Sequence, residues 1–163
     1  MKTIKCQPLT KEAFAPFGEY YHMDKPDGYP LTGEIHKFYP DRVTCYQGHN
    51  VAFSPLVVTK PEQMLVTKAE YHTTTCEVLM PITDDMILHV APPSAGEPVV
   101  EHTKAFIVPK NTVVKINACV WHLAPLPVNK DEITVMIVLP ECTYINDCTV
   151  VDFKKEDYFI IEK

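Results

Sequence analysis

The sequence predicts an all-β protein built as an antiparallel barrel or sandwich, and two observations carry this expectation. Fifteen prolines stand against five glycines, and proline favours turns and strand edges over helices. From residue 43 onward, short apolar runs alternate with turn-forming residues at the spacing of an all-β domain. These runs predict about nine strands: 43–46, 51–59, 63–71, 77–82, 86–91, 104–108, 113–117, 133–139 and 149–153.

The same pattern predicts one fully buried strand, one helix and one long loop. Both faces of the run 133–139 are largely apolar, which is typical of a strand inside a closed or doubled sheet. Residues 8–18 predict a single short helix that Thr10 caps and that Pro16 and Gly18 end. Residues 22–41 are rich in Pro, Gly, Asp and Tyr, and we expect an ordered loop or a lid there.

Length and composition indicate one domain, residues 1–163, of an ordinary globular kind. The 15 basic residues are scattered along the chain, and the formal net charge of -6 argues against a nucleic-acid partner. No apolar stretch approaches the roughly 20 residues that span a bilayer. No secretory signal is recognisable, so we expect a cytoplasmic protein. The six cysteines form no Cys-x-x-Cys pair, and we expect reduced thiols.

A group of ionisable residues begins in the last part of the third of these strands and continues just beyond it. Two-residue alternation points Lys68, Glu70 and His72 toward one face of the run 63–72. The chain reverses direction after His72 at Thr73-Thr74-Thr75, which we call the threonine turn, so that Glu77 faces these residues from the next strand. A second imidazole comes from His122, about fifty residues later. Carboxylates and imidazoles on neighbouring strands suit a divalent ion such as Mn, Fe, Ni or Zn.

Each of these residues, taken alone, has a simpler explanation. A histidine on an apolar strand is usually a hydrogen-bonded structural residue. Lys68 and Glu70 would also fit a solvent-facing charge pair on an edge strand. The four together, Glu70, His72, Glu77 and His122, favour a metal or substrate site.

The order of these residues resembles the two motifs of the cupin superfamily. Glu70-x-His72-x4-Glu77 resembles the first motif, His-x-His-x3/4-Glu, with a glutamate in place of the first histidine. The segment from Pro109 to His122 resembles the second motif, Pro-x-Gly followed by a histidine. Asn111 stands at the glycine position, and asparagine tolerates the same left-handed backbone. The resemblance implies a cupin-type antiparallel β-barrel, or jelly roll, with a short N-terminal helix.

More narrowly, the chain is similar to the ureidoglycolate lyase family of cupins. The similarity extends from Leu9 to about residue 152, and it is closest in the opening 8–18 and around Val120-Trp121-His122. It implies a homodimeric, metal-dependent lyase that splits (S)-ureidoglycolate into glyoxylate and urea in the breakdown of allantoin and purine nitrogen. The small hydroxy-acid substrate would chelate the ion, and Glu77 or Glu70 would act as the general base.

The site also departs from the family pattern. Glu77 stands where the family has glutamine, Asn117 stands where it has a histidine, and Leu123 replaces a histidine. These departures leave two alternatives open. One is a different metal-dependent cupin enzyme, an isomerase or epimerase acting on another hydroxy acid, keto acid or sugar. The other is a cupin that binds a small ligand without catalysis.

Further candidate residues surround this group. Lys68 and Lys115 are candidates to hold the substrate carboxylate, and Lys68 is also a catalytic candidate. Asn117 and Trp121 are candidate substrate-binding residues. His89 lies in the middle of the run 86–91 and could point into the barrel, where it would bind substrate or serve as a third nitrogen ligand.

Overall fold

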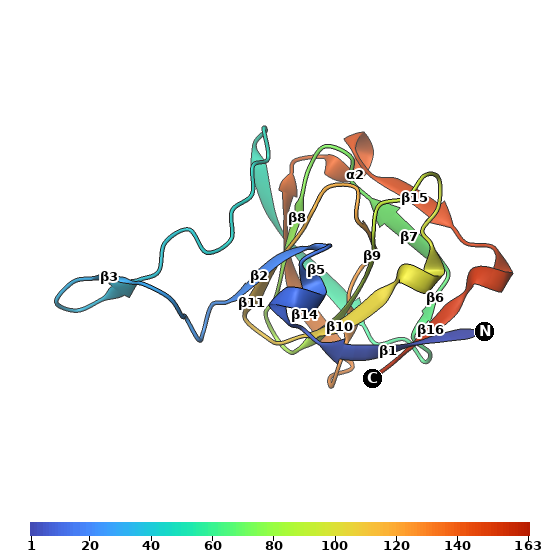
Figure 1. Ribbon diagram of the computed structural model, residues 1–163, viewed down its shortest axis with the longest axis horizontal. Coiled ribbons are helices and arrows are strands. Elements are labelled where there is room, and N and C mark those ends of the chain that lie inside the picture. Colours follow the sequence, from blue (N-terminus) through green and yellow to red (C-terminus); the bar gives the residue numbers. More distant parts are fainter.

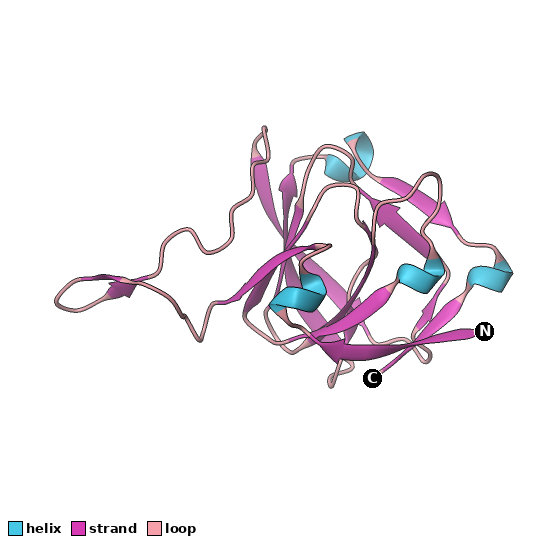
Figure 2. Cartoon of the chain, viewed as in Figure 1, coloured by secondary structure: helices cyan, strands magenta, loops and turns pink.

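The computed structural model describes all residues, 1–163, and contains two large sheets and a small hairpin (Figures 1 and 2). The nine-stranded sheet runs in the order β15 (Thr149–Asp152), β7 (Lys68–Tyr71), β12 (Trp121–His122), β9 (Met86–Ala91), β10 (Lys104–Val108), β1 (Lys2–Pro8), β16 (Phe159–Glu162) and β6 (Leu65–Val66), with β13 (Leu126–Pro127) beside β9. The five-stranded sheet runs in the order β2 (Gly18–His22), β11 (Thr112–Ile116), β8 (Glu77–Pro81), β14 (Glu132–Pro140) and β5 (Val51–Thr59). The hairpin pairs β3 (Leu31–Thr32) with β4 (Lys37–Phe38).

The two large sheets curl around a common interior, which confirms the predicted all-β, cupin-type barrel (Figure 2). Pairing is antiparallel except for β1, which is parallel to both β10 and β16. The helical segments are short: α1 (Lys11–Phe14), α2 (Thr143–Asn146) and the 3-10 turns η1 (Val100–His102) and η2 (Lys155–Asp157). None of them has the length and apolar character needed to cross a membrane.

The core has two parts, separated by the strands of the nine-stranded sheet. Leu88 and Val90 of β9 point into the barrel interior, which the five-stranded sheet closes from the other side. Ile87 and Ala91 point the opposite way, into a second apolar layer beneath β16. This alternation along one strand decides which side chains reach the interior.

Helix α1 forms within the predicted segment 8–18 but spans only Lys11–Phe14, and it places Phe14 in the barrel interior. The Thr10 hydroxyl accepts a hydrogen bond from the backbone N–H of Ala13 at 3.2 Å and caps the helix. Phe14 is fully buried, and its ring lies edge-on to that of Phe106 with centroids 5.3 Å apart.

The strand predictions succeed where turns are clearly marked. β5, β9 and β10 have the predicted bounds, and Asn111 adopts the expected left-handed conformation with φ 61°. The run 63–71 is divided at Thr67, because its carbonyl bonds outside the strand to the N–H of Phe153. β1, β2 and β16 were not predicted, and β12 and β13 are too short to give a pattern.

Two predictions for the N-terminal half are wrong. Residues 43–46 form no strand and belong to the loop that leads into β5. Within that loop Cys45 forms a disulfide with Cys76, so this pair is not reduced as expected. The loop passes over the start of β8 and brings together two thiols that are 31 residues apart. The other four cysteines are free.

Phe14→Ala is expected to lower the free energy of unfolding by about 3–5 kcal/mol. The reason is that Phe14 is fully buried against the rings of Phe17, Tyr20 and Phe106. Urea unfolding followed by circular dichroism measures the loss. Tyr144 is 77% exposed, and Tyr144→Ala serves as a control expected to change stability by no more than about 0.5 kcal/mol. Similar small losses for both variants would contradict the placement of α1.

Candidate metal centre

Three of the predicted ligands meet inside the barrel. His72 follows β7, Glu77 begins β8 and His122 ends β12. Their ligand atoms all lie within 4.8 Å of one another. One carboxylate oxygen, Glu77 Oε2, lies 2.9 Å from His72 Nε2 and 3.0 Å from His122 Nε2. All three side chains are buried, with exposed fractions of 4%, 7% and 2% in the order His72, Glu77, His122.

Local backbone structure explains how His122 reaches this place. Trp121 and His122 point to opposite faces of β12, so that Trp121 packs in the outer apolar layer while His122 faces inward. The turn before β12 contains Cys119 in a left-handed conformation, φ 64°. The Cys119 N–H donates to the carbonyl of His72 at 2.7 Å and ties the two histidine segments together.

Backbone carbonyls fix the orientation of both rings. His72 Nδ1 lies 2.6 Å from the Asp147 carbonyl oxygen, and His122 Nδ1 lies 2.9 Å from that of Val120. A carbonyl oxygen only accepts hydrogen bonds, so each Nδ1 carries a proton and donates it. Each Nε2 is therefore turned toward Glu77. Metal-binding histidines have this arrangement, with one nitrogen held by a backbone carbonyl and the other free to coordinate.

The charges of the three groups are strongly coupled. Burial raises the pKa of Glu77, but the hydrogen bonds with His122 and His72 lower it more, to about 2. Burial lowers the pKa of each imidazole, whereas the contact with Glu77 raises it, and both pKa values end above the usual value for histidine. Two imidazole nitrogens and a carboxylate oxygen converge on one buried point. This donor set fits a divalent transition-metal ion.

Glu70 lies beside this cluster rather than in it. It pairs with His122 across β7 and β12, so the two side chains share a face. Its carboxylate oxygen Oε2 accepts from the Cys148 thiol at 3.4 Å. Burial and the neighbouring Glu70 charge raise the pKa of that thiol to about 11. The structure brings together three of the four predicted ligands and leaves Glu70 adjacent to them.

The two lysines lie away from the cluster. Lys68 is exposed at the start of β7, where it pairs in register with Asp152. Lys115 pairs in register with Val78, whose side chain points to the opposite face from that of Glu77. It forms an ion pair with Glu19 and donates to the Thr44 carbonyl at 3.1 Å. Neither lysine contacts the three buried residues.

The remaining candidates do not face the cluster either. The Trp121 indole N–H donates to the Ser94 hydroxyl at 2.9 Å within the outer layer. Asn117 is exposed in the turn before β12. His89 does not point into the barrel: it faces the outer layer beside Phe159, with ring centroids 6.0 Å apart. Neither of its ring nitrogens has a hydrogen-bond partner, and burial lowers its pKa to about 4.

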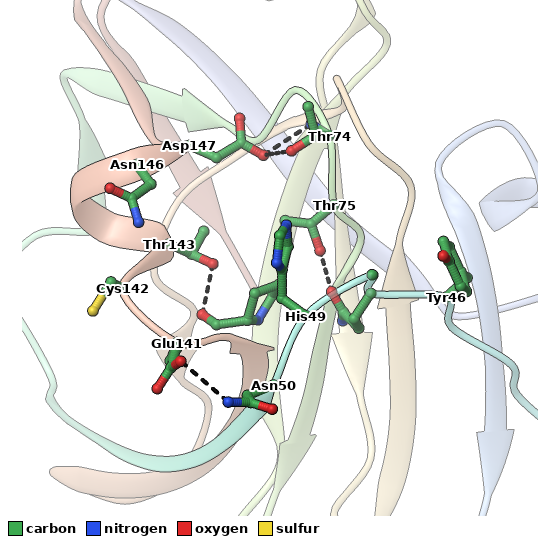
Figure 3. Close-up of a pocket in the computed structure, with 13 residues that line it drawn as sticks. Tyr46, His49, Asn50, Thr74, Thr75, Glu141, Cys142, Thr143, Asn146 and Asp147 are labelled. Atoms are coloured by element: carbon green, nitrogen blue, oxygen red, sulfur yellow. Dashed lines mark hydrogen bonds between the residues drawn. The ribbon is translucent and has the colours of Figure 1, made fainter.

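Asp147 is not predicted from the sequence, although it forms hydrogen bonds with both His72 and the threonine turn. Its carbonyl fixes His72, while its carboxylate accepts from the N–H groups of Thr73 and Thr74 at 2.7 and 2.8 Å. Figure 3 shows this carboxylate beside Thr74, with dashed lines marking the hydrogen bonds between the two residues. No sequence motif marks Asp147, because it follows the short helix α2 and approaches His72 from 75 residues away.

A cavity of about 670 Å³ lies beside this edge (Figure 3). Its walls are the loop 46–50, the turn 74–75 and the segment around α2. Most of its lining side chains are polar, and they include the amides of Gln47, Asn50 and Asn146. The three buried residues do not line this cavity, and Asp147 with the threonine turn stands between them and it.

Asp147→Ala is expected to lower the free energy of unfolding by about 1–3 kcal/mol, because it leaves the N–H groups of the threonine turn without their charged acceptor. Chemical denaturation measures the change. Asp131 is exposed and its side chain makes no hydrogen bond, so Asp131→Ala is the matched control. An Asp147 variant as stable as this control would show that the carboxylate does not support the turn.

The family profile and the named relatives that match this chain carry the same description. The sequence profile described as ureidoglycolate lyase matches residues 1–160. Proteins named ureidoglycolate lyase from Pseudomonas fluorescens Pf0-1 and Stutzerimonas stutzeri A1501 are 24% and 25% identical to this chain, over 99% of its length and 98% and 96% of theirs. A solved structure of Bacillus subtilis oxalate decarboxylase, studied for its Mn(II) centres, has a TM-score of 0.44 at 13% identity and covers 77% of this chain, which spans 30% of that protein. The profile match over nearly the whole length assigns this chain to the ureidoglycolate lyase family.

Proposed function

We propose that this protein is a lyase that cleaves ureidoglycolate into glyoxylate and urea. The observation that carries the proposal is the match of residues 1–160 to the ureidoglycolate lyase family. The buried cluster of His72, Glu77 and His122 supplies a place for the chemistry. The curated relatives that bear this name align with the chain from end to end.

The cluster would hold one divalent ion through His72 Nε2, His122 Nε2 and a Glu77 oxygen. When bound, such an ion supplies Lewis acidity, which lowers the pKa of a substrate hydroxyl. The donor set is compatible with Ni, Mn, Zn or Fe. The fixed Nδ1 hydrogen bonds keep both rings in the orientation that binding requires, so little reorganisation is needed.

Of the two nearby carboxylates, Glu70 is better suited to move a proton. Glu77 Oε2 is engaged by both imidazoles, whereas Glu70 contacts only the Cys148 thiol at 3.4 Å. Glu70 takes the proton of the substrate hydroxyl, and the oxygen electrons form the carbonyl of glyoxylate. The electron pair of the breaking C–N bond moves to nitrogen. Glu70 then returns its proton to that nitrogen, and urea leaves.

A second candidate is a metal-dependent enzyme of the same fold acting on another hydroxy acid, keto acid or sugar. Glu77, Asn117 and Leu123 favour it, because they are the positions at which the site departs from the family pattern. Incubation with ureidoglycolate separates the two candidates. A metal-loaded protein that releases no glyoxylate above background would favour the second.

The protein is expected to bind about one Mn, Ni or Zn ion per chain and to melt at a higher temperature when it is bound. Elemental analysis and thermal unfolding measure both effects. His72→Ala and His122→Ala should each remove the stabilisation, because each deletes one nitrogen ligand. His102→Ala, which alters an exposed histidine, should retain it. Wild-type protein with neither bound metal nor a stability gain would exclude the metal centre.

Glu70→Gln is expected to lower kcat for glyoxylate release by about 10²–10⁴-fold while leaving metal content unchanged. Glu77→Ala should lower both, because it removes a ligand. Steady-state kinetics with metal analysis on the same samples distinguish a proton-transfer residue from a ligand. Full activity of Glu70→Gln would rule out its role as the base, and full activity of Glu77→Ala would refute the centre.

A further inference from the structure

One covalent bond joins two distant segments of the chain directly beside the buried centre. The disulfide between Cys45 and Cys76 spans 31 residues, and Cys76 immediately precedes Glu77, the first residue of β8. Both cysteines are half-buried, and neither belongs to the two apolar parts of the core. The bond therefore lies near the surface, where a small thiol can approach its sulfur atoms.

The disulfide fastens an irregular loop rather than the sheet itself. Residues 39–50 contain no helix or strand. On the other side of the bond, β8 is held by backbone pairing with β11 and with β14. Opening the disulfide would leave this pairing in place. Its effect would fall on the loop and on the few residues that lead into β8.

Besides the disulfide, hydrogen bonds hold this loop. Gln47 Nε2 donates to the Cys76 carbonyl at 3.1 Å, and the Thr75 hydroxyl donates to Gln47 Oε1. Asn50 Nδ2 donates to the Glu141 carboxylate at 3.3 Å beside the polar cavity (Figure 3). A hydrogen bond of this kind contributes little net stability, whereas a crosslink that closes a long loop contributes more. The disulfide is therefore the strongest attachment between the loop and the start of β8.

The same bond affects the position of Glu77. Its Oε2 atom meets both imidazoles only within a narrow range of positions, at 2.9 and 3.0 Å. The segment 73–77 is fixed at its beginning, where the Asp147 carboxylate accepts from the N–H groups of Thr73 and Thr74. It is fixed at its other end by the disulfide at Cys76. Since Cys76 and Glu77 share a peptide bond, any freedom that Cys76 gains passes directly to Glu77.

We propose that Cys45 and Cys76 form a reversible thiol–disulfide exchange site that sets the affinity of the centre for its metal ion. The inference rests on the proposed binding of that ion by His72, Glu77 and His122. The co-reactant is a dithiol. One of its thiolates attacks a sulfur of the disulfide, which breaks that bond and forms a mixed disulfide. Its second thiolate then closes the reductant's own disulfide, and two electrons and two protons have passed to the protein as two cysteine thiols.

The two forms differ in how much order the ion must create. In the disulfide form the segment 73–77 is fixed at both ends, so ion binding costs little further conformational freedom. In the dithiol form, binding must also order the end that the bond had held. Coupling between two sites is reciprocal, so the ion must favour the disulfide by the same factor by which the disulfide favours the ion. A crosslink unrelated to the centre would show no such reciprocity.

Calorimetric titration of the oxidised and the dithiothreitol-reduced protein with Mn(II) tests the proposal. Mn(II) is chosen because it prefers oxygen and imidazole ligands, so free thiols compete little for it. We expect the dissociation constant to rise about tenfold on reduction. Saturating Mn(II) should then make the reduction midpoint of the disulfide about 30 mV more negative, which is a tenfold factor for a two-electron couple. Denatured protein should present four reactive thiols before reduction and six after it.

Two variants and one measurement without metal complete the test. Cys45→Ser should bind Mn(II) as weakly as the reduced protein, with no change on adding dithiothreitol. Cys142→Ser alters an exposed free thiol, and it is the matched control expected to behave as the wild type. In metal-free protein, reduction should raise hydrogen exchange in residues 44–50 and 73–77, while exchange in the buried strand β9 stays unchanged.

The outcomes separate this inference from the metal centre itself. Equal dissociation constants in the two redox states, or a reduction midpoint that Mn(II) does not shift, would overturn the proposal and leave the centre intact. Six reactive thiols in protein exposed to air, or unchanged hydrogen exchange on reduction, would overturn it equally. If neither redox state binds Mn(II), the proposed centre is refuted and its coupling to the disulfide with it.

Discussion

The carboxylate of Glu77 between two imidazoles is the interaction on which the centre depends. Both Nε2 atoms lie within 3.0 Å of one oxygen, and all three side chains are buried. A buried charge that loses its partner costs about 3–5 kcal/mol, so none of the three can be removed without affecting the others. The surrounding fold serves this contact: the Asp147 and Val120 carbonyls orient the rings, and the turn at Cys119 joins the histidine segments.

The two sheets contribute different residues to the centre. His122 lies in the nine-stranded sheet, His72 directly follows its strand β7, and Glu77 begins a strand of the five-stranded sheet. The centre therefore exists only while the sheets face each other across the core. The Cys45–Cys76 disulfide is a covalent connection between the loop that leads into β5 and the start of the strand that carries Glu77.

Much of this fold was predictable, and so was part of the centre. Strand alternation and the spacing from His72 to Glu77 are local signals, and they placed these two residues together. The parallel strand β1 and the Asp147 carbonyl act over long sequence separations that no local pattern reports. His89 was misplaced because both faces of β9 are apolar, so the sequence does not distinguish the barrel interior from the outer layer. The carboxylate of Glu70 contacts the thiol of Cys148, which is 78 residues away and which no local pattern reports.

The central claim is that His72, Glu77 and His122 bind one divalent ion together. X-ray absorption spectroscopy of the metal-loaded protein tests it most directly, because the scattering pattern identifies the ligand atoms. We expect two imidazole ligands with oxygen in the remaining positions, and one imidazole after His122→Ala. A first coordination sphere of oxygen alone, or one containing sulfur from the free cysteines, would contradict the account.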